Sequence, residues 1–152
     1  MLFNYIGYFK ALRPNSSGGY QKPYKPALLL AVIEGIETGE IQNNKIYITP
    51  ELIASFRNYR ELLGASTPYQ IRHFIYPFYH LKSEDFWQLK EQPGKRLVIN
   101  SAGSVTSMKQ LREAIDYARL DLSLWQELAN PKARNILRDV LLGTYTAPVE
   151  AS

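Results

Sequence analysis

Residues 27–36 read A-L-L-L-A-V-I-E-G-I and are apolar on nearly every side of a helix. Pro26 suits the first helical position, because that position needs no N–H donor and proline already has a helical φ. Gly39 suits the left-handed residue that follows a helix end. A helix that is apolar all round is buried all round. The sequence therefore predicts a central helix against which the other elements pack.

The composition is that of one globular domain. The chain has 152 residues, of which 45% are hydrophobic and 21% charged, enough for a real core. No apolar run approaches a membrane span and residues 1–12 do not form a signal peptide, so we expect a cytoplasmic protein. The lack of cysteine excludes disulfides, thiol nucleophiles and Cys-based metal sites. We expect the domain to occupy residues 1–146, with a flexible tail at 147–152.

The remaining pattern predicts a mainly helical α+β single domain with a small antiparallel hairpin. Thr49-Pro50-Glu51 has the residues of a helix start, and the helix that follows should place Arg57 and Arg60 in solvent. Further helices are expected at 2–12, 107–117, 122–128 and from 131 onward. Strands are expected at 45–48, 86–89 and 96–99, the last two joined as a hairpin by a turn at 92–94.

Arg72–Trp87, which reads R-H-F-I-Y-P-F-Y-H-L-K-S-E-D-F-W, holds both histidines and six aromatic residues. Basic groups interleaved with rings suit nucleic acid, because cations neutralise phosphate and rings offer flat contacts. The alternative is a buried aromatic core, since large rings are mostly packing residues. Pro77 disfavours helical backbone at Tyr76, so a turn is expected there.

Positive charge is concentrated in two segments. Residues 1–33 carry four basic and no acidic groups, and residues 72–112 carry seven basic and three acidic groups. The segments that follow them, residues 34–71 and 113–152, each carry a net charge of −2. If the basic segments share one face, that face attracts a polyanion; otherwise they are solvated lysines and arginines.

The residues of an active site are missing. His73 and His80 are separated by Pro77 and have no further ligand at zinc spacing. The chain has no Walker-type glycine loop, paired carboxylates, serine elbow or H-E-x-x-H motif. We therefore expect no catalytic residue, metal site or cofactor.

Several segments together resemble one family, and they are Y-K-P-A-L-L-L (24–30), I-T-P-E-L-I (48–53), Y-P-F-Y-H-L (76–81), F-W-Q-L (86–89), Y-A-R-L-D (117–121) and P-K-A-R-N-I-L-R (131–138). In this order they resemble the sulfur-binding domain that precedes the HNH nuclease in phosphorothioate-dependent, McrA-type restriction endonucleases. The resemblance covers nearly the whole chain. It implies recognition of DNA in which sulfur replaces one non-bridging phosphate oxygen.

The resemblance also implies a site. The family's Tyr–Pro pair matches Tyr76 and Pro77, and the third position after the proline, which walls the sulfur cavity, matches His80. The pair before the buried helix matches Tyr24 and Lys25, although relatives commonly have histidine where this chain has Tyr24. A later Pro-plus-basic element falls at 93–96. The full set of expected DNA or sulfur contacts is Gln21, Tyr24, Lys25, Pro26, Arg72, His73, Tyr76, Pro77, His80, Lys82, Pro93, Lys95 and Arg96.

Roles within this set follow from chemistry. Basic residues should hold the phosphates that flank the sulfur, and these are Lys25, Arg72, Lys82, Lys95 and Arg96. Polar side chains should reach the bases, and these are Gln21, Tyr24, His73 and Arg96. An HNH domain would follow Ser152, so this chain alone should not cut DNA, and a nuclease domain or subunit is an expected partner. A second copy of the chain is left open as another.

Two other functions stay open. One is a general DNA-binding module that senses only backbone charge and shape. The other is a protein-interaction domain that docks a partner on the aromatic stretch.

Overall fold

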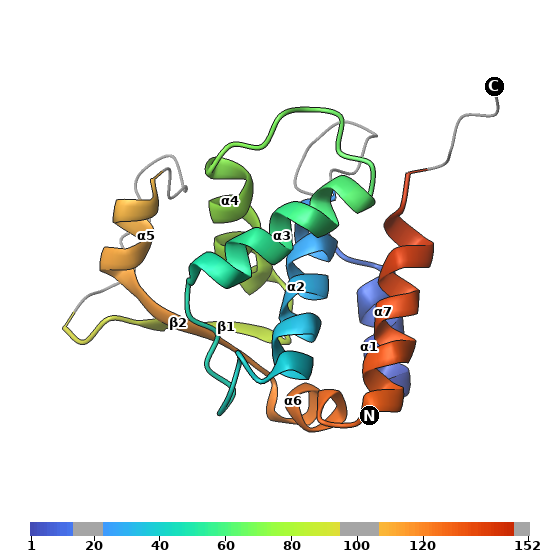
Figure 1. The fold of residues 1–152 in the computed structure, drawn as a ribbon. Coiled ribbons are helices and arrows are strands. Elements are labelled where there is room, and N and C mark those ends of the chain that lie inside the picture. The colour runs from blue at the N-terminus through green and yellow to red at the C-terminus, as the bar shows by residue number, and fades with distance from the viewer. Residues whose placement is uncertain (14–22, 95–106, 148–152) are drawn as a thin grey trace.

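The computed structural model describes residues 1–13, 23–94 and 107–147 of the chain. The described part is mainly helical with one antiparallel pair of strands, which confirms the predicted α+β class (Figure 1). In chain order its elements are α1 (Leu2–Lys10), α2 (Tyr24–Thr38), α3 (Pro50–Leu62), α4 (Arg72–His80), the 3₁₀ turn η1 (Leu81–Ser83), β1 (Trp87–Glu91), α5 (Met108–Ala114), β2 (Ile115–Leu120), α6 (Leu122–Leu128) and α7 (Pro131–Tyr145).

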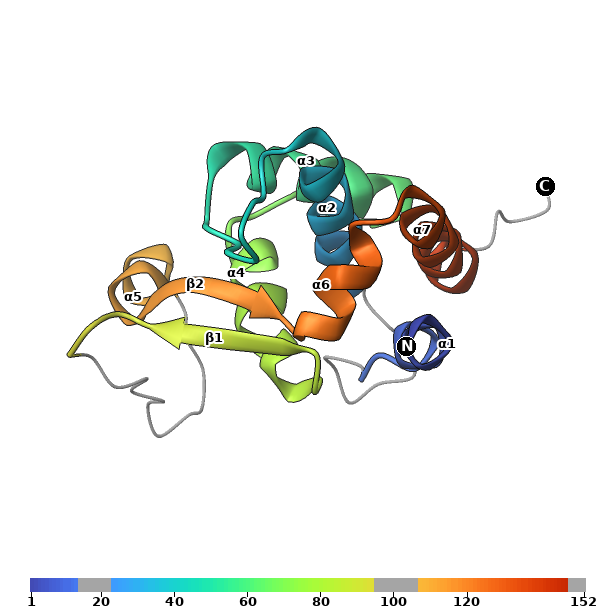
Figure 2. The same cartoon turned by 90° about the horizontal axis from the view of Figure 1, so that it is seen from below.

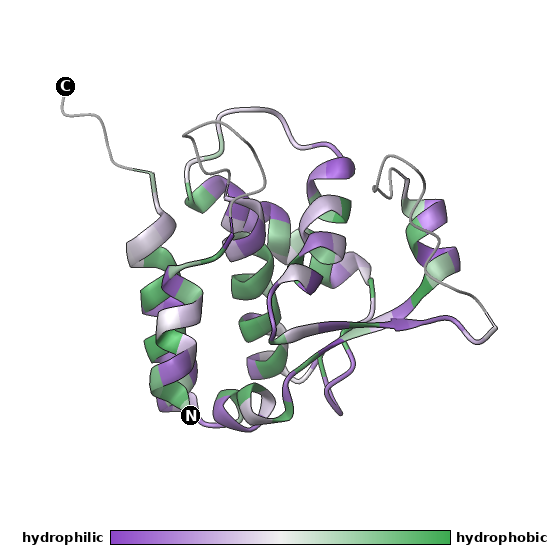
Figure 3. Cartoon of the chain, turned by 180° about the vertical axis from the view of Figure 1, so that it is seen from behind, coloured by the Kyte–Doolittle hydropathy of each residue, from purple (hydrophilic) through white to green (hydrophobic). Residues whose placement is uncertain are grey.

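The apolar helix α2 is the centre of the fold, as predicted. It contacts α3, α4 and α7, and its apolar residues run along the middle of the molecule (Figure 3). Leu28, Leu29 and Leu30 are at most 2% exposed. Gly39 ends the helix with a φ of 84°, in the left-handed region that glycine adopts without steric cost.

Helix α3 begins where predicted. The Thr49 hydroxyl accepts a hydrogen bond from the Leu52 N–H at 3.1 Å, and Pro50 occupies the first turn. Phe56 and Leu52 are buried and Arg57 is exposed. The prediction that Arg60 points into solvent is wrong, because this residue is only 2% exposed.

The aromatic stretch forms a helix where a turn was expected. Helix α4 runs without interruption through Pro77. Proline removes the single hydrogen bond that residue 77 would donate to the carbonyl of residue 73. The burial of Phe74, Phe78 and their neighbours in the core outweighs that loss, since each large ring contributes about 1.5–3 kcal/mol when buried.

Strand β1 pairs with β2 in antiparallel register, from Trp87 opposite Leu120 to Lys90 opposite Tyr117 (Figure 2). The expected partner, residues 96–99, lies outside the described residues. The helix predicted to reach Tyr117 ends at Ala114 instead. Residues 115–120 gain ladder bonds on both edges, because Ala118 also exchanges backbone hydrogen bonds of 2.8 and 2.9 Å with Ile46. The predicted strand at 45–48 is reduced to two isolated bridges, this one and that of Lys45 with Gln42.

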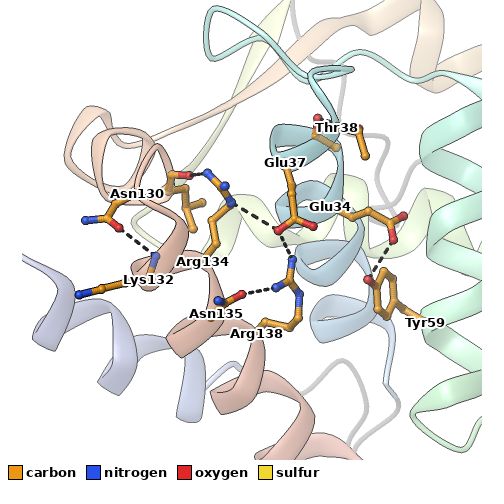
Figure 4. Close-up of polar contacts among 11 residues, drawn as sticks. Glu34, Glu37, Thr38, Tyr59, Asn130, Lys132, Arg134, Asn135 and Arg138 are labelled. Atoms are coloured by element: carbon orange, nitrogen blue, oxygen red, sulfur yellow. Dashed lines mark hydrogen bonds and ion pairs between the residues drawn. The ribbon is translucent and has the colours of Figure 1, made fainter.

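Helices α1 and α7 pack side by side and are joined by one tyrosine. The Tyr145 hydroxyl donates to the Phe9 carbonyl at 2.6 Å and accepts from the Leu12 N–H at 3.0 Å. On the other side, Glu37 of α2 lies between Arg134 and Arg138 of α7 (Figure 4). Arg138, and then Arg134, lowers the pKa of the Glu37 carboxyl. None of the described helices is long and apolar enough to cross a membrane.

Candidate nucleic-acid interface

The predicted contact residues come from the start of α2, the whole length of α4 and the turn after α4. Helices α2 and α4 are in contact, and both begin at the same end of the molecule (Figure 1). The first supplies Tyr24, Lys25 and Pro26, and the second supplies most of the remainder. Lys82 follows in η1. The structure therefore brings together the described members of the set other than Pro93.

Pro93 lies in the turn after β1, which extends away from the helices in both views (Figures 1 and 2). It is exposed. Its predicted companions Lys95 and Arg96, together with Gln21, lie outside the described residues.

Tyr76 and His80 form a ring pair on one face of α4. They are four residues apart and so lie one turn above the other, with ring centroids 4.2 Å apart and planes inclined by 33°. Tyr76 is 36% exposed and His80 is half-buried, whereas Pro77 is buried. The accessible part of the predicted sulfur contact is therefore the ring pair.

The imidazole of His80 is biased toward its neutral form. Burial is the main cause of a lowered pKa relative to the usual 6.5, and the charges of Lys25 and Lys82 lower the pKa further. A neutral imidazole stacked on a phenol ring is a largely apolar contact surface at pH 7.

The remaining aromatic rings of the stretch are not surface groups. Of its six aromatic residues, Phe74, Phe78, Tyr79, Phe86 and Trp87 are at most 1% exposed. The Trp87 indole donates to the Phe78 carbonyl at 3.0 Å, which satisfies its buried N–H. An aromatic docking patch would thus have only Tyr76 of this stretch to offer.

Lys25 is buried and internally paired. It is 3% exposed, its Nζ donates to Ser83 Oγ at 3.1 Å, and it lies 3.5 Å from Glu84 Oε1. Burial lowers the pKa of Lys25, while Glu84 acts in the opposite direction. Glu84 also accepts from the Arg13 N–H at 2.8 Å. A phosphate would have to compete with this carboxylate for the lysine.

Lys82 and Arg72 are exposed and better placed for phosphate. The Lys82 ammonium donates to the Tyr79 hydroxyl at 2.9 Å and lies 4.2 Å from the centre of that ring. This contact holds the charge of Lys82 beside the Tyr76–His80 pair. No ion pair among the described residues joins Lys82 to an acidic side chain.

His73, predicted to reach a base, is instead 6% exposed. Its ring stacks on Tyr24 with centroids 5.1 Å apart, and its Nδ1 accepts a hydrogen bond from the Gln70 N–H at 3.0 Å. In this geometry Nδ1 carries no proton. His73 thus fixes the start of α4 and forms one wall of a cavity beside it.

A cavity of about 320 Å³ opens between the starts of α2 and α4 and the loop that follows α3. Its walls include Pro23, Tyr24, Arg60, Thr67, Arg72 and His73. Arg60 Nη2 donates to the Thr67 carbonyl at 2.7 Å and to the Thr67 hydroxyl at 2.8 Å. Its guanidinium carbon lies 5.9 Å from the centre of the Tyr24 ring. Its buried Nε makes no hydrogen bond in the described structure.

Sequence reasoning missed Arg60, although a signal was present. Arg60 follows Phe56 by four residues and precedes Leu63 by three, so it shares a helix face with two buried residues. Because arginine is charged, the residue was instead assigned to the solvent-facing side of the helix. The negative end of the α3 dipole stabilises a cation there by about 0.3–1 kcal/mol, which is less than the several kcal/mol that burying a charge costs.

No group of three potential metal ligands comes together among the described residues. The sequence matches no protein-family model, and the search of curated proteins finds no match.

Proposed function

We propose that this domain binds DNA carrying a phosphorothioate linkage and that the Tyr76–His80 ring pair contacts the sulfur. The observation that carries the proposal is the partly exposed, neutral ring pair flanked by the Lys82 cation. Around it, Lys82 and Arg72 hold the neighbouring phosphates and set the register of the DNA. Binding would deliver a nuclease domain or subunit to modified DNA, and the domain itself performs no chemistry.

Selectivity follows from the hydration of sulfur. Sulfur is larger and softer than oxygen and binds water weakly, so contact with ring carbons removes little hydration from it. A phosphate oxygen in the same place would lose strong hydrogen bonds to water. An uncompensated polar group costs about 1–3 kcal/mol in proteins, which corresponds to roughly 10- to 100-fold discrimination from a single atom.

The direct test is a fluorescence-polarisation titration with one short duplex in three forms: plain, Rp-phosphorothioate and Sp-phosphorothioate at a single linkage. The salt concentration should be about 0.15 M, since charge contacts make the affinity depend on salt. We expect tight binding to one isomer and weak binding to plain DNA. Equal binding to all three would refute sulfur recognition and leave a module that senses backbone charge. No binding to any of them would point to a protein partner.

Two substitutions localise the site. Tyr76→Ala should remove the preference for sulfur, because it deletes half of the ring pair. Tyr8→Ala is the matched control, since Tyr8 is 50% exposed on α1, away from α4. Lys82→Ala should weaken plain and modified DNA by similar factors, because it removes a charge that both backbones attract.

A further inference from the structure

The cavity beside Arg60 combines a buried cation and a second arginine at its rim, and none of the described residues that line it is acidic. We propose that it is a binding site for a phosphate group, with Arg60 as its buried counter-charge. The site shares Arg72 with the proposed DNA interface but does not use the Tyr76–His80 pair, so it goes beyond the proposed sulfur contact and does not depend on it.

The first support is the missing counter-ion of Arg60. Buried charges are paired in stable proteins, yet no ion pair joins Arg60 to any carboxylate of the described residues. Both of its described hydrogen bonds come from Nη2 and end on neutral oxygens of Thr67. The sequence outside the described ranges contains one acidic residue, Glu150. An anion from outside the domain would complete the site.

The second support is the orientation of the surrounding elements. The cavity is lined by Pro23 and Tyr24 at the start of α2 and by Arg72 and His73 at the start of α4. Helix starts carry positive partial charge, and the N-cap residues Pro23 and Ile71 make no side-chain cap in the described part of the chain. Helix dipoles, Arg60 and Arg72 therefore all favour negative charge in the same space. The Thr67 hydroxyl adds a polar group to the wall.

The cavity is also larger than the anion needs. Its volume of about 320 Å³ falls at the lower end of pockets that hold small organic ligands, so the phosphate arrives as part of a larger molecule. The stacked Tyr24 and His73 rings offer an apolar wall for a sugar or base. Two sources share this chemistry: a phosphate of a nucleic-acid strand, and the phosphate of a free mononucleotide.

The test is a titration of the full chain with inorganic phosphate, monitored by ¹H–¹⁵N correlation spectra. Chloride balances the added phosphate so that the ionic strength stays constant. We expect saturable shifts confined to the backbone amides of residues 65–68 and 72–73, with a Kd of about 1 mM or tighter. Shifts spread over all basic surfaces, or no saturation by about 10 mM phosphate, would overturn the proposal.

Variants separate a built site from general charge attraction. Arg72→Gln should weaken phosphate binding about tenfold, the effect of losing one charge-assisted hydrogen bond. Arg57→Gln is the matched control, because Arg57 is an exposed arginine of α3, the helix that also holds Arg60, and it contacts Tyr69 without lining the cavity. Equal weakening by the two variants would refute the site. Arg60→Met should abolish binding while the chain stays folded by circular dichroism; retained binding would also refute the site.

Competition then identifies the source. A plain duplex without terminal phosphates should displace bound phosphate if the site holds a backbone phosphate. Displacement by adenosine monophosphate alone would assign the site to a free nucleotide. Displacement by neither would contradict a phosphate-bearing ligand. These experiments use no phosphorothioate, so failure of sulfur recognition would leave them unaffected.

Discussion

The buried pair of Lys25 and Glu84 gives the sharpest test of how the domain is held together beside its proposed interface. Glu84→Gln keeps an oxygen that can accept from the Arg13 N–H, so it removes charge with little other change. Breaking a buried ion pair costs about 3–5 kcal/mol. We expect about 2–3 kcal/mol here, because Ser83 Oγ still accepts from the ammonium. For a chain of this size, that loss lowers Tm by about 5–10 °C.

The control and the pH dependence make the prediction specific. Asp85→Asn removes the neighbouring exposed carboxylate and should change the free energy of unfolding by no more than about 0.5 kcal/mol. Loss of Glu84 lowers the pKa of Lys25 further, since Glu84 is the group that raises it. Between this lowered pKa and the usual value of 10.5, the unfolded chain binds more protons than the folded chain. Stability therefore rises with pH, and the destabilisation should be smaller near about pH 10 than at neutral pH.

The assay is chemical denaturation of the wild type, Glu84→Gln, Lys25→Met and the double variant. Replacing both partners removes the unpaired charge, so the double variant should recover most of the stability that Glu84→Gln loses, with a coupling energy of about 2 kcal/mol. Additive effects, or a Glu84→Gln protein as stable as the wild type, would show that the ion pair is not energetically coupled.

Three further predictions concern other contacts. The His80 imidazole should show a pKa below 6.5 in an NMR titration. Since the unfolded chain binds more protons between the folded pKa and 6.5, the contribution of the neutral imidazole to stability is present above pH 6.5 and is lost as pH falls through the folded pKa. A measured pKa above 6.5 would contradict a neutral ring pair. Tyr145→Phe should cost about 1–3 kcal/mol in urea unfolding, because the Phe9 carbonyl and the Leu12 N–H lose their shared partner; no loss would mean that water replaces the hydroxyl. Thr49→Ala should cost about 1 kcal/mol in the same assay through the lost cap of α3, whereas exposed Thr38, whose hydroxyl bonds only within α2, should tolerate alanine.

Local signals were sufficient where the chain makes its own contacts. Thr49 and Pro50 mark the start of α3 by capping chemistry that needs no distant partner, and the same is true of Ser107, whose hydroxyl accepts from the Gln110 N–H at the start of α5. The all-round apolar pattern of α2 likewise required burial wherever its partners came from.

Predictions failed where a distant partner decides the structure. Residues 115–117 were expected to continue a helix, but pairing with β1 makes them the start of β2, and the same strand also pairs with Ile46 through Ala118. Pro77 was expected to bend the chain, but the core that α4 enters outweighs one missing hydrogen bond. Such contacts are long-range and leave no local trace in the sequence.

The surroundings of the two buried cations of the candidate site were also predicted wrongly, because a distant contact decides them. Lys25 was expected to hold phosphate, and Arg60 to be solvated. Lys25 in fact has an internal carboxylate partner, and Arg60 has none among the described residues. An incoming anion adds little electrostatic stabilisation to a cation that is already paired with a carboxylate. It adds much more to a buried cation that lies beside a cavity and has no ion-pair partner. What distinguishes them is the place of Glu84, 59 residues after Lys25 in the chain but 3.5 Å from it in the fold. The phosphate contact in this part of the domain is therefore better sought at Arg60 and Arg72 than at Lys25.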